Sequence, residues 1–279
     1  MVHRFFIEFS LQDLKKLLGI DEDQNVANDE KFSQNYNLRT LEYMPIILKD
    51  DSDSDMLKIE VQQFSLKNEK HNNLLLNSRI EDVEIKFKQV VANKLNRCVL
   101  AIDGYYEWTE DKKKIYAIKP KQVNQRMFLG ALKMSEEGNF VVFTQEAKCE
   151  IGKIHARMPL FIKQEDIQTY LSDDNFSQMK QKISQHNEEF IKSELEVFRV
   201  GENVNDQKDR SKNCLLKFEE FQKKQDSKGI KRFFSVIPKK ETQNASTKEQ
   251  KQEKNYDDDN NIQNQDQVKE SLQKKVKKN

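Results

Sequence analysis

Short apolar runs, each about the length of a strand, recur along most of the chain. They lie at residues 1–7, 43–48, 57–66, 98–102, 115–118, 127–132, 140–144 and 195–200. Such runs, bounded by polar or turn-forming residues, are typical of strands buried on one or both faces. We therefore expect much β-structure, in which the runs from 98 to 144 form a meander and Asp103-Gly104 makes a turn.

Three segments have helical spacing instead. Ser10 is a residue type that begins helices, Asp13 follows it three positions later, and Gly19 is a type that ends them. Residues 164–171 and 175–191 also place apolar side chains at helical intervals. Strands and helices together predict a mixed α+β fold.

The composition limits the classes of protein and site that the chain fits. It has 279 residues, 34% of them charged, and a formal net charge of +1, so a nucleic-acid surface would have to be a local patch. Cys98, Cys149 and Cys214 lack the spacing of a zinc site or a disulfide framework, and we expect no metal and no cofactor. No apolar run reaches membrane-spanning length and no signal peptide begins the chain. We expect a protein of the nucleus, or of the cytoplasm if the source is not eukaryotic.

The composition changes beyond residue 223, where Lys, Gln, Asn, Asp and Ser dominate and apolar residues become isolated. Residues 239–279 cannot bury enough surface to offset the entropy lost on ordering. We therefore expect one domain over residues 1–222 and a disordered, low-complexity tail over residues 223–279.

Two motifs stand out between the predicted strands. Residues 103–108 read Asp-Gly-Tyr-Tyr-Glu-Trp, and residues 154–159 read Ile-His-Ala-Arg-Met-Pro. Together they resemble the SRAP family, the SOS-response-associated peptidase-like proteins that process abasic sites in DNA. Further segments are similar to the family in the same order, at residues 36–38, 77–83 and 200–215. The resemblance implies an α+β domain of curved antiparallel β-sheets flanked by helices.

The first residues depart from the family. It opens Met-Cys-Gly-Arg, whereas this chain opens Met1-Val2-His3-Arg4. In the family Met is removed, the α-amine of the new N-terminal Cys forms a Schiff base with an opened abasic sugar, and the thiol closes a thiazolidine. An α-amine has a pKa of about 7.7 to 8.0, so roughly a tenth is neutral and nucleophilic at pH 7. We therefore expect that Val2 can form a reversible Schiff base and promote β-elimination, but cannot close the ring.

The resemblance assigns catalytic roles to three more residues. Asn77 would orient the amine or the sugar, Glu107 would relay a proton at the attacking nitrogen, and His155 would act as acid and base at the sugar ring oxygen. Each residue also has an ordinary interpretation. Asn77 would then cap a loop, Glu107 would pair with a lysine, and His155 would be a hydrogen-bonded core histidine.

DNA contacts are implied in the same way. Arg4, Arg79 and Arg157 would meet phosphates. Phe64 lies where the family has Trp and would stack on a base, although a core residue at the end of a strand is an equal interpretation. The expected partner is single-stranded DNA that carries abasic sites.

A short apolar island interrupts the predicted tail at residues 227–234. It resembles the interaction box that binds the replication sliding clamp (PCNA), with Ile230, Phe233 and Phe234 as anchors in one pocket. Ser227 stands where that box has Gln. The sliding clamp is thus a second expected partner, and the ordinary alternative is an apolar turn that closes the domain.

The expected function is recognition and processing of abasic sites on single-stranded DNA in the DNA damage response. The chemistry would be a Schiff-base lyase reaction, or DNA–protein cross-linking impaired by Val2 in place of Cys. The main alternative is a catalytically inactive adaptor that binds DNA and the sliding clamp. A third is that the true start was missed and a Met-Cys-Gly-Arg opening exists. The chemical identity of the mature N-terminus separates all three.

Overall fold

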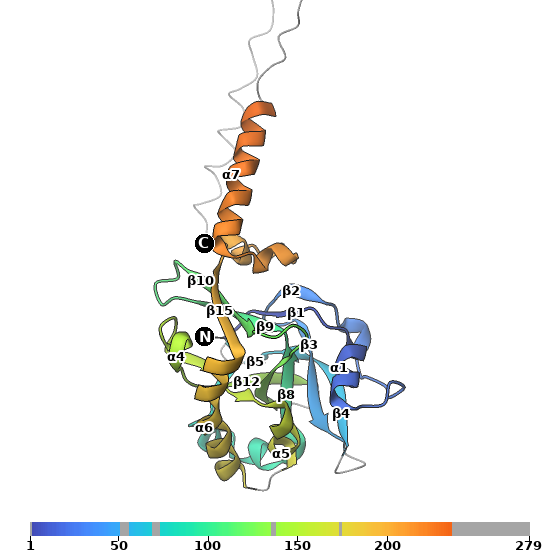
Figure 1. The fold of residues 1–279 in the computed structure, drawn as a ribbon. Helices are drawn as coiled ribbons and strands as arrows, with labels where there is room; N and C mark the ends of the chain where they lie inside the picture. Colours follow the sequence, from blue (N-terminus) through green and yellow to red (C-terminus); the bar gives the residue numbers. More distant parts are fainter. Residues whose placement is uncertain (1, 51–55, 69–72, 135–137, 173–174, 236–279) are drawn as a thin grey trace, which may run out of the picture. The chain divides into compact units, whose positions relative to one another are not determined.

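Two sheets organise the chain (Figure 1). The computed structural model describes residues 2–50, 56–68, 73–134, 138–172 and 175–235, and the side chains at positions 68, 73, 186 and 228–235 lie outside that description. The predicted α+β class with curved sheets and flanking helices is confirmed.

The smaller sheet has five strands and contains the start of the chain. Its order is β15 (Leu195–Val200), β10 (Ile115–Pro120), β9 (Gly104–Trp108), β1 (Phe5–Ile7) and β2 (Asn35–Leu38), and neighbouring strands are antiparallel. β1 lies between β9 and β2 and is fully buried, which explains its unbroken apolar run.

The larger sheet closes on itself. Its order is β13 (Arg157–Pro159), β12 (Asn139–Glu146), β4 (Leu57–Phe64), β3 (Tyr43–Lys49), β8 (Arg97–Ile102), β11 (Met127–Lys133) and β14 (Phe161–Ile162). β12 pairs with both β4 and β11, so these strands form a ring with β3 and β8. Most pairs are antiparallel, but β12 runs parallel to β4 and to β7 (Asn77–Arg79). A closed ring hides strand edges and encloses a core.

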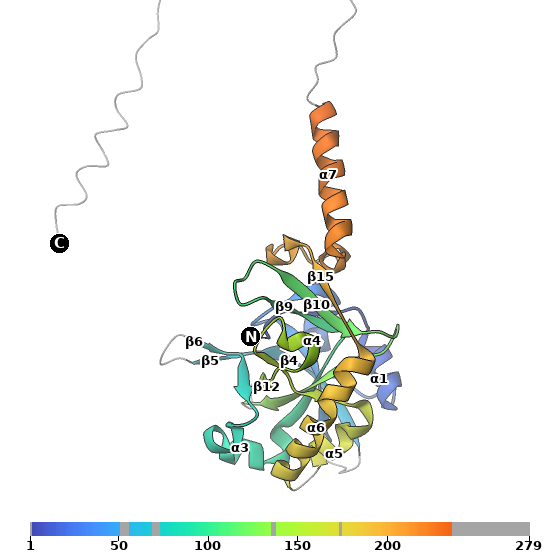
Figure 2. The same ribbon diagram turned by 60° about the vertical axis from the view of Figure 1, so that its left-hand side comes forward.

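The remaining elements are short, apart from two long helices. They are α1 (Leu11–Leu18), η1 (Asp29–Lys31), β5 (Leu66–Asn68), β6 (Asn73–Leu75), α2 (Val83–Lys86), α3 (Lys88–Ala92), η2 (Lys94–Asn96), α4 (Cys149–Gly152), η3 (Gln164–Asp166), α5 (Ile167–Ser172), α6 (Phe176–Glu194), η4 (Glu202–Asn205), η5 (Lys212–Leu215) and α7 (Phe218–Ser235). α5 and α6 lie side by side against the larger sheet in both views (Figures 1 and 2).

Helix α1 confirms the prediction made from its end residues. The Ser10 side chain accepts a hydrogen bond from the Asp13 backbone, and the Asp13 carboxylate accepts one from the Ser10 backbone. Gly19 ends the helix in the left-handed conformation, with φ of 66°. These contacts are local in sequence, so the sequence alone could predict them.

The predicted meander from residue 98 to 144 is wrong at its first turn. β8 belongs to the larger sheet and β9 to the smaller one, so Asp103-Gly104 passes the chain between sheets instead of reversing it. The Asp103 carboxylate accepts hydrogen bonds from the backbone N–H groups of Glu8 and Phe9. A Cβ at Gly104 would overlap the Phe6 ring, so glycine permits the close approach of the two strands.

Two apolar clusters hold the fold together. The larger one fills the ring and the space beneath the helices, and it includes Val2, Phe5 and Tyr105. The smaller one lies on the other side of the five-stranded sheet and includes Phe6 and Tyr106. Because consecutive residues of β1 and β9 belong to different clusters, the five-stranded sheet is packed on both faces.

Helix α7 extends past the domain boundary predicted at residue 222. Its first turn is fixed to β15, because the Arg199 guanidinium lies 3.4 Å from the centroid of the Phe218 ring. The side chains of Ile230, Phe233 and Phe234, the anchors of the predicted clamp box, lie outside the described residues, as does the chain from residue 236 onward. Within the described residues, no helix is both long and apolar enough to cross a membrane.

Candidate active site

The pairing of β1 with β9 sets the position of the chain start. Phe5 lies opposite Tyr105, and the Tyr106 backbone N–H donates to the Arg4 carbonyl oxygen at 2.9 Å. When this antiparallel register is continued beyond the paired residues, Glu107 lies opposite His3. Val2 then lies one residue beyond His3, towards the chain start. Two segments about a hundred residues apart in sequence therefore meet at the end of the smaller sheet.

Asn77 joins them from the larger sheet. Its side-chain N–H donates to the Val2 carbonyl oxygen at 2.9 Å, and β7 is held beside β12 by the parallel pairing of Asn77 with Val142. The Asn77 amide oxygen is buried and has no hydrogen-bond partner among the described residues. The Asn77 side chain is thus held through its N–H group, whereas its amide oxygen accepts no hydrogen bond from the described residues.

Glu107 is buried, with 1% of its surface exposed. One carboxylate oxygen accepts the Trp108 backbone N–H at 3.2 Å. Tyr105 precedes it on the same side of β9, and its hydroxyl is buried without a hydrogen-bond partner among the described residues. Burial raises the pKa of Tyr105 well above its ordinary value, and the negative charge of Glu107 adds to the shift. Tyr105 therefore keeps its proton and remains a hydrogen-bond donor.

His155 lies in the segment between α4 and β13. Its Nδ1 lies 3.0 Å from the Arg157 backbone nitrogen and 3.1 Å from the Arg157 carbonyl oxygen, two contacts that fit opposite tautomers of the ring. β13 and β7 flank β12, since Thr144 pairs with both Pro159 and Arg79. The segments that carry His155 and Asn77 are thus neighbours of the same strand.

The three predicted phosphate contacts differ in their surroundings. Arg79 is exposed at the end of β7. Arg157 is held by Glu81 through two hydrogen bonds of 2.8 Å and donates to the Thr144 carbonyl oxygen at 2.6 Å, so a phosphate would have to compete with Glu81. Only Arg79 presents its charge to solvent without such competition.

Arg4 is turned inward, contrary to the prediction of a DNA contact. It is 9% exposed and donates to the Asn37 side-chain oxygen at 2.8 Å, and burial lowers the pKa of its guanidinium. Asn37 in turn donates to the carbonyl oxygens of Val204, Asp206 and Asp209. The Arg4 side chain therefore holds β1 and β2 to the segment after β15.

Phe64 is also corrected by the structure. It is fully buried, with its ring centroid 5.1 Å from that of Phe5 and 5.6 Å from that of Phe140. A base cannot reach this ring, so the alternative interpretation, a core residue at the end of a strand, is the one that fits.

Two residues outside the predicted site lie beside Val2. The His3 ring stacks on Trp108, with centroids 5.0 Å apart and planes inclined by 19°. Trp108 belongs to the motif of residues 103–108, but nothing local in the sequence indicates that its ring meets that of His3.

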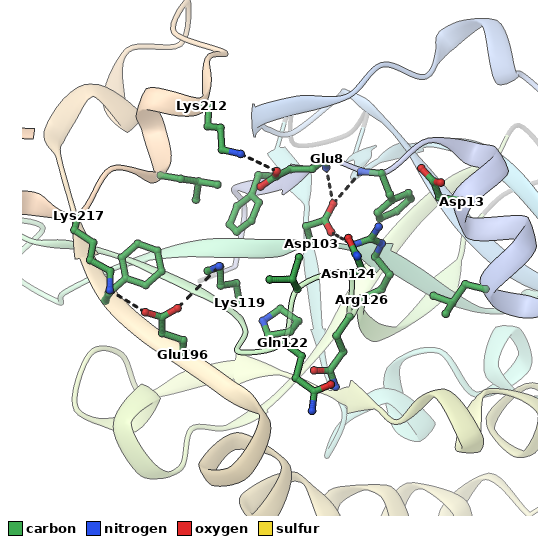
Figure 3. Close-up of a pocket in the computed structure, with 18 of the residues that line it drawn as sticks. Glu8, Asp13, Asp103, Lys119, Gln122, Asn124, Arg126, Glu196, Lys212 and Lys217 are labelled. Atoms are coloured by element: carbon green, nitrogen blue, oxygen red, sulfur yellow. Dashed lines mark hydrogen bonds and ion pairs between the residues drawn. The ribbon is translucent and has the colours of Figure 1, made fainter. Parts of the chain in front are cut away.

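A large cleft lies elsewhere (Figure 3). This cleft, about 1080 Å³ in volume, lies between β1, α1, the β10–β11 connection, β15 and η5, and none of Val2, Asn77, Glu107 and His155 lines it. Three of its five carboxylates have ion-pair partners within it: Asp103 with Arg126 at 2.7 Å, Glu8 with Lys212 at 3.5 Å, and Glu196 with Lys217 at 3.1 Å. A choice of site by cleft volume alone would therefore have selected this cleft instead of the region around Val2. No group of His, Cys, Asp and Glu side chains in the described part of the chain is arranged to hold a metal ion.

Known proteins match most of this chain. The sequence model of the family described as SOS response associated peptidase (SRAP) matches residues 1–207. The abasic site processing protein YoqW of Bacillus subtilis (strain 168) is 24% identical over an alignment of 229 residues that covers 77% of this chain and 99% of that protein.

Solved structures resemble the fold. A protein from Bacteroides thetaiotaomicron superposes with a TM-score of 0.56 at 15% identity, over 76% of this chain and 99% of its own. A phage-related protein from Bordetella bronchiseptica gives a TM-score of 0.54 at 15% identity, over 71% of this chain and 93% of its own. At this identity the likeness concerns the fold alone.

Proposed function

This chain belongs to the SOS response associated peptidase (SRAP) family, and we propose that it processes abasic sites in single-stranded DNA through the α-amine of Val2. The observation that carries the proposal is the hydrogen bond from Asn77 to the Val2 carbonyl oxygen, which ties the chain start to the residues expected to act on the sugar. A relative named as an abasic site processing protein supports the choice of substrate.

The reaction begins once Met1 has been removed. The neutral Val2 amine attacks the aldehyde carbon of the opened sugar, and loss of water from the adduct gives an iminium. A base then takes a proton from the neighbouring sugar carbon, the electron pair expels the 3′ phosphate, and water hydrolyses the iminium to free the amine. Val2 offers no thiol, so no thiazolidine can form.

The neighbouring side chains take separate roles in this sequence. Asn77 fixes the Val2 carbonyl and hence the direction of the amine. Glu107 moves protons to and from the attacking nitrogen, and His155 serves the sugar ring oxygen. Arg79 is exposed and meets a phosphate of the strand.

The test is the intact mass of the purified full chain before and after incubation with an abasic single strand and borohydride. A mass that begins at Val2 and a reduced adduct on the strand are expected. Val2→Cys is the matched variant, and we expect it to form a cross-link that survives without borohydride. A protein that begins at Val2, binds the strand normally and gives no adduct would reject the lyase reaction.

The burial of Val2 favours a second candidate function. Val2 is 0% exposed, and a branched apolar side chain in place of a thiol suits a packed core better than a reaction centre. In this case the protein is an adaptor that binds DNA without acting on it. Retention of Met1 in the native protein, together with strand binding, would support this function over the first.

We also propose that residues 227–234 bind the replication sliding clamp, which would place the protein in the nucleus of a eukaryotic cell. The support is the resemblance of the Ile230, Phe233 and Phe234 spacing to the clamp-binding box. Binding of purified clamp to the full chain should be lost on changing Phe233 and Phe234 to Ala. Equal binding by the double variant would reject the assignment.

A further inference from the structure

The stacked rings of His3 and Trp108 form a small aromatic surface beside Val2. Both side chains are partly exposed, whereas the nearby rings of Phe5, Phe64 and Tyr105 are completely buried. The centroids of the stacked rings are 5.0 Å apart. A ligand that approached Val2 would therefore meet the exposed parts of this stack.

The stack is held in place from a second element. The Trp108 indole N–H donates to the Asn205 side-chain oxygen of η4 at 3.1 Å, and β9 ends at Trp108 in antiparallel pairing with Ile115 of β10. A ring fixed in this way loses little freedom when another ring stacks on it, which favours binding.

A turn rich in lysine follows the stack directly. It is residues 109–114, which connect β9 to β10 and are closed by hydrogen bonds from Lys112 N–H to the Thr109 carbonyl oxygen and from Thr109 N–H to the Lys114 carbonyl oxygen. Lys112, Lys113 and Lys114 are all exposed. The ion pair of Lys113 with Asp111, at 3.9 Å between two exposed side chains, holds little of this charge.

We propose that the His3–Trp108 stack and the lysine turn (residues 109–114) together bind the single strand next to the reacting sugar. A base adjacent to the abasic nucleotide stacks on one outer face of the His3–Trp108 pair, and the lysines contact the phosphates that follow. Aromatic rings that hold bases and cations that hold the backbone are the combination by which proteins bind single strands without regard to sequence. The inference deepens the proposed function and rests on it for the abasic nucleotide, but it predicts binding to undamaged strands as well.

Trp108 makes the proposal directly measurable, since it is the only Trp among the 279 residues. The full chain is titrated with undamaged oligothymidylate while tryptophan fluorescence and the anisotropy of a label on the strand are recorded. We expect saturable quenching that follows the anisotropy, because a base stacked on or beside the indole changes its emission.

Variants separate the rings from the charges. His3→Ala should weaken binding about tenfold, and His3→Phe should restore most of it because a ring is kept. Replacing Lys112, Lys113 and Lys114 by Gln should reduce the slope of log affinity against log salt by about 2. The matched control is Lys119→Gln, a charge removed at the other end of β10, which should leave the slope unchanged.

Each of these results tests one part of the proposal: the ring stack, the phosphate contacts or the lyase reaction. Full binding by anisotropy with unchanged tryptophan emission overturns the stack, as does His3→Phe binding as weakly as His3→Ala while both unfold like the parent protein. A triple lysine variant with the parental slope overturns the phosphate contacts. Quenching by undamaged strands without a borohydride adduct on abasic strands supports the binding surface and rejects the lyase. An adduct without quenching supports the lyase and rejects the stack.

Discussion

The cleft beside Asp103 and the candidate site around Val2 flank the two ends of β1, and they differ in how their polar atoms are paired. In the cleft, the carboxylates of Glu8, Asp103 and Glu196 each have a cation within ion-pair distance. At the site, the Asn77 amide oxygen and the Tyr105 hydroxyl are buried without partners among the described residues. Buried polar atoms without partners cost stability, so a protein tends to keep them where they serve a ligand.

Within the cleft, Asp103 has a structural role. Asp103 accepts backbone hydrogen bonds from the end of β1 and pairs with Arg126 from the β10–β11 connection. It thereby joins the two sheets where the chain passes between them. The three ion-paired carboxylates thus distinguish the cleft, although the amide oxygen of Gln125, which also lines it, is buried without a partner among the described residues.

The largest expected effect tests the structural role of the cleft. Asp103→Ala should lower the free energy of unfolding by about 3–5 kcal/mol, because it leaves the Arg126 side chain, 13% exposed, without its counter-charge. Urea denaturation measures the loss. Glu196→Ala, which removes a carboxylate with 34% exposure from the same cleft, should cost less than about 1 kcal/mol. Equal small losses for both would mean that Asp103 does not hold the sheets together.

The next effect tests the site. Asn77→Ala should reduce the rate of borohydride-trapped complex formation about a hundredfold, since the Val2 carbonyl loses the donor that orients it. The unfolding free energy should change by only about 1 kcal/mol. Asn96→Ala is a matched control, because the Asn96 side chain makes the same kind of bond to the Val90 carbonyl oxygen at 3.0 Å. If both variants trapped the abasic strand at the same rate, Asn77 would have no part in the reaction.

Two neighbouring tyrosines sharpen the comparison at a smaller scale. The Tyr106 hydroxyl donates to the Tyr36 carbonyl oxygen at 2.8 Å, whereas the Tyr105 hydroxyl has no partner in the described chain. Tyr106→Phe should therefore cost about 1–2 kcal/mol of unfolding free energy, and Tyr105→Phe should be neutral or slightly stabilising. Denaturation curves of the two variants give the answer, and the opposite order would show that the Tyr105 hydroxyl is paired in solution.

The smallest effect concerns pH at the rim of the site. Burial alone would raise the pKa of Glu81, but the hydrogen bonds from Arg157 outweigh it and hold that pKa below its ordinary value. A carboxylate with a lowered folded pKa adds stability above its unfolded pKa of about 4.3, and this stability is lost as the pH falls through the folded pKa. Glu81→Gln should thus lose less stability than the parent between about pH 5 and pH 3.

The size of that difference is limited by exposure. The Glu81 side chain is 48% exposed, so we expect less than about 1 kcal/mol, measured by urea denaturation at each pH. Glu22→Gln, in an exposed loop, is the control and should follow the parent curve. A Glu81→Gln curve that also follows the parent at every pH would show that the pair with Arg157 adds nothing.

Most elements could be predicted from the sequence because their causes are local. The capping residues Ser10, Asp13 and Gly19 fix α1 within a few residues of one another. The apolar runs of β3, β8 and β11 mark strands buried in the ring, whatever their partners are. The candidate catalytic residues came from comparison with family motifs; in the structure Asn77 donates to the Val2 carbonyl oxygen, and Glu107 lies on β9, the strand that pairs with β1.

The two corrected DNA contacts, Arg4 and Phe64, are both buried. Arg4 precedes β1, whose residues are all buried, and Phe64 ends β4, where partly exposed and buried residues are mixed, so in both places burial depends on tertiary partners and not on local alternation. For the same reason the sequence did not reveal that His3 meets Trp108.

The sequence by itself determined the local elements, the family motifs and the loss of the thiol at position 2. Only the tertiary structure decided that Asp103-Gly104 passes the chain from one sheet to the other, and which of the consecutive residues Tyr105 and Tyr106 faces the site. Hydrogen bonds within a turn or a cap depend on neighbours in sequence. Sheet membership and side-chain direction in a fully buried strand depend on partners about a hundred residues away, and no local pattern records them.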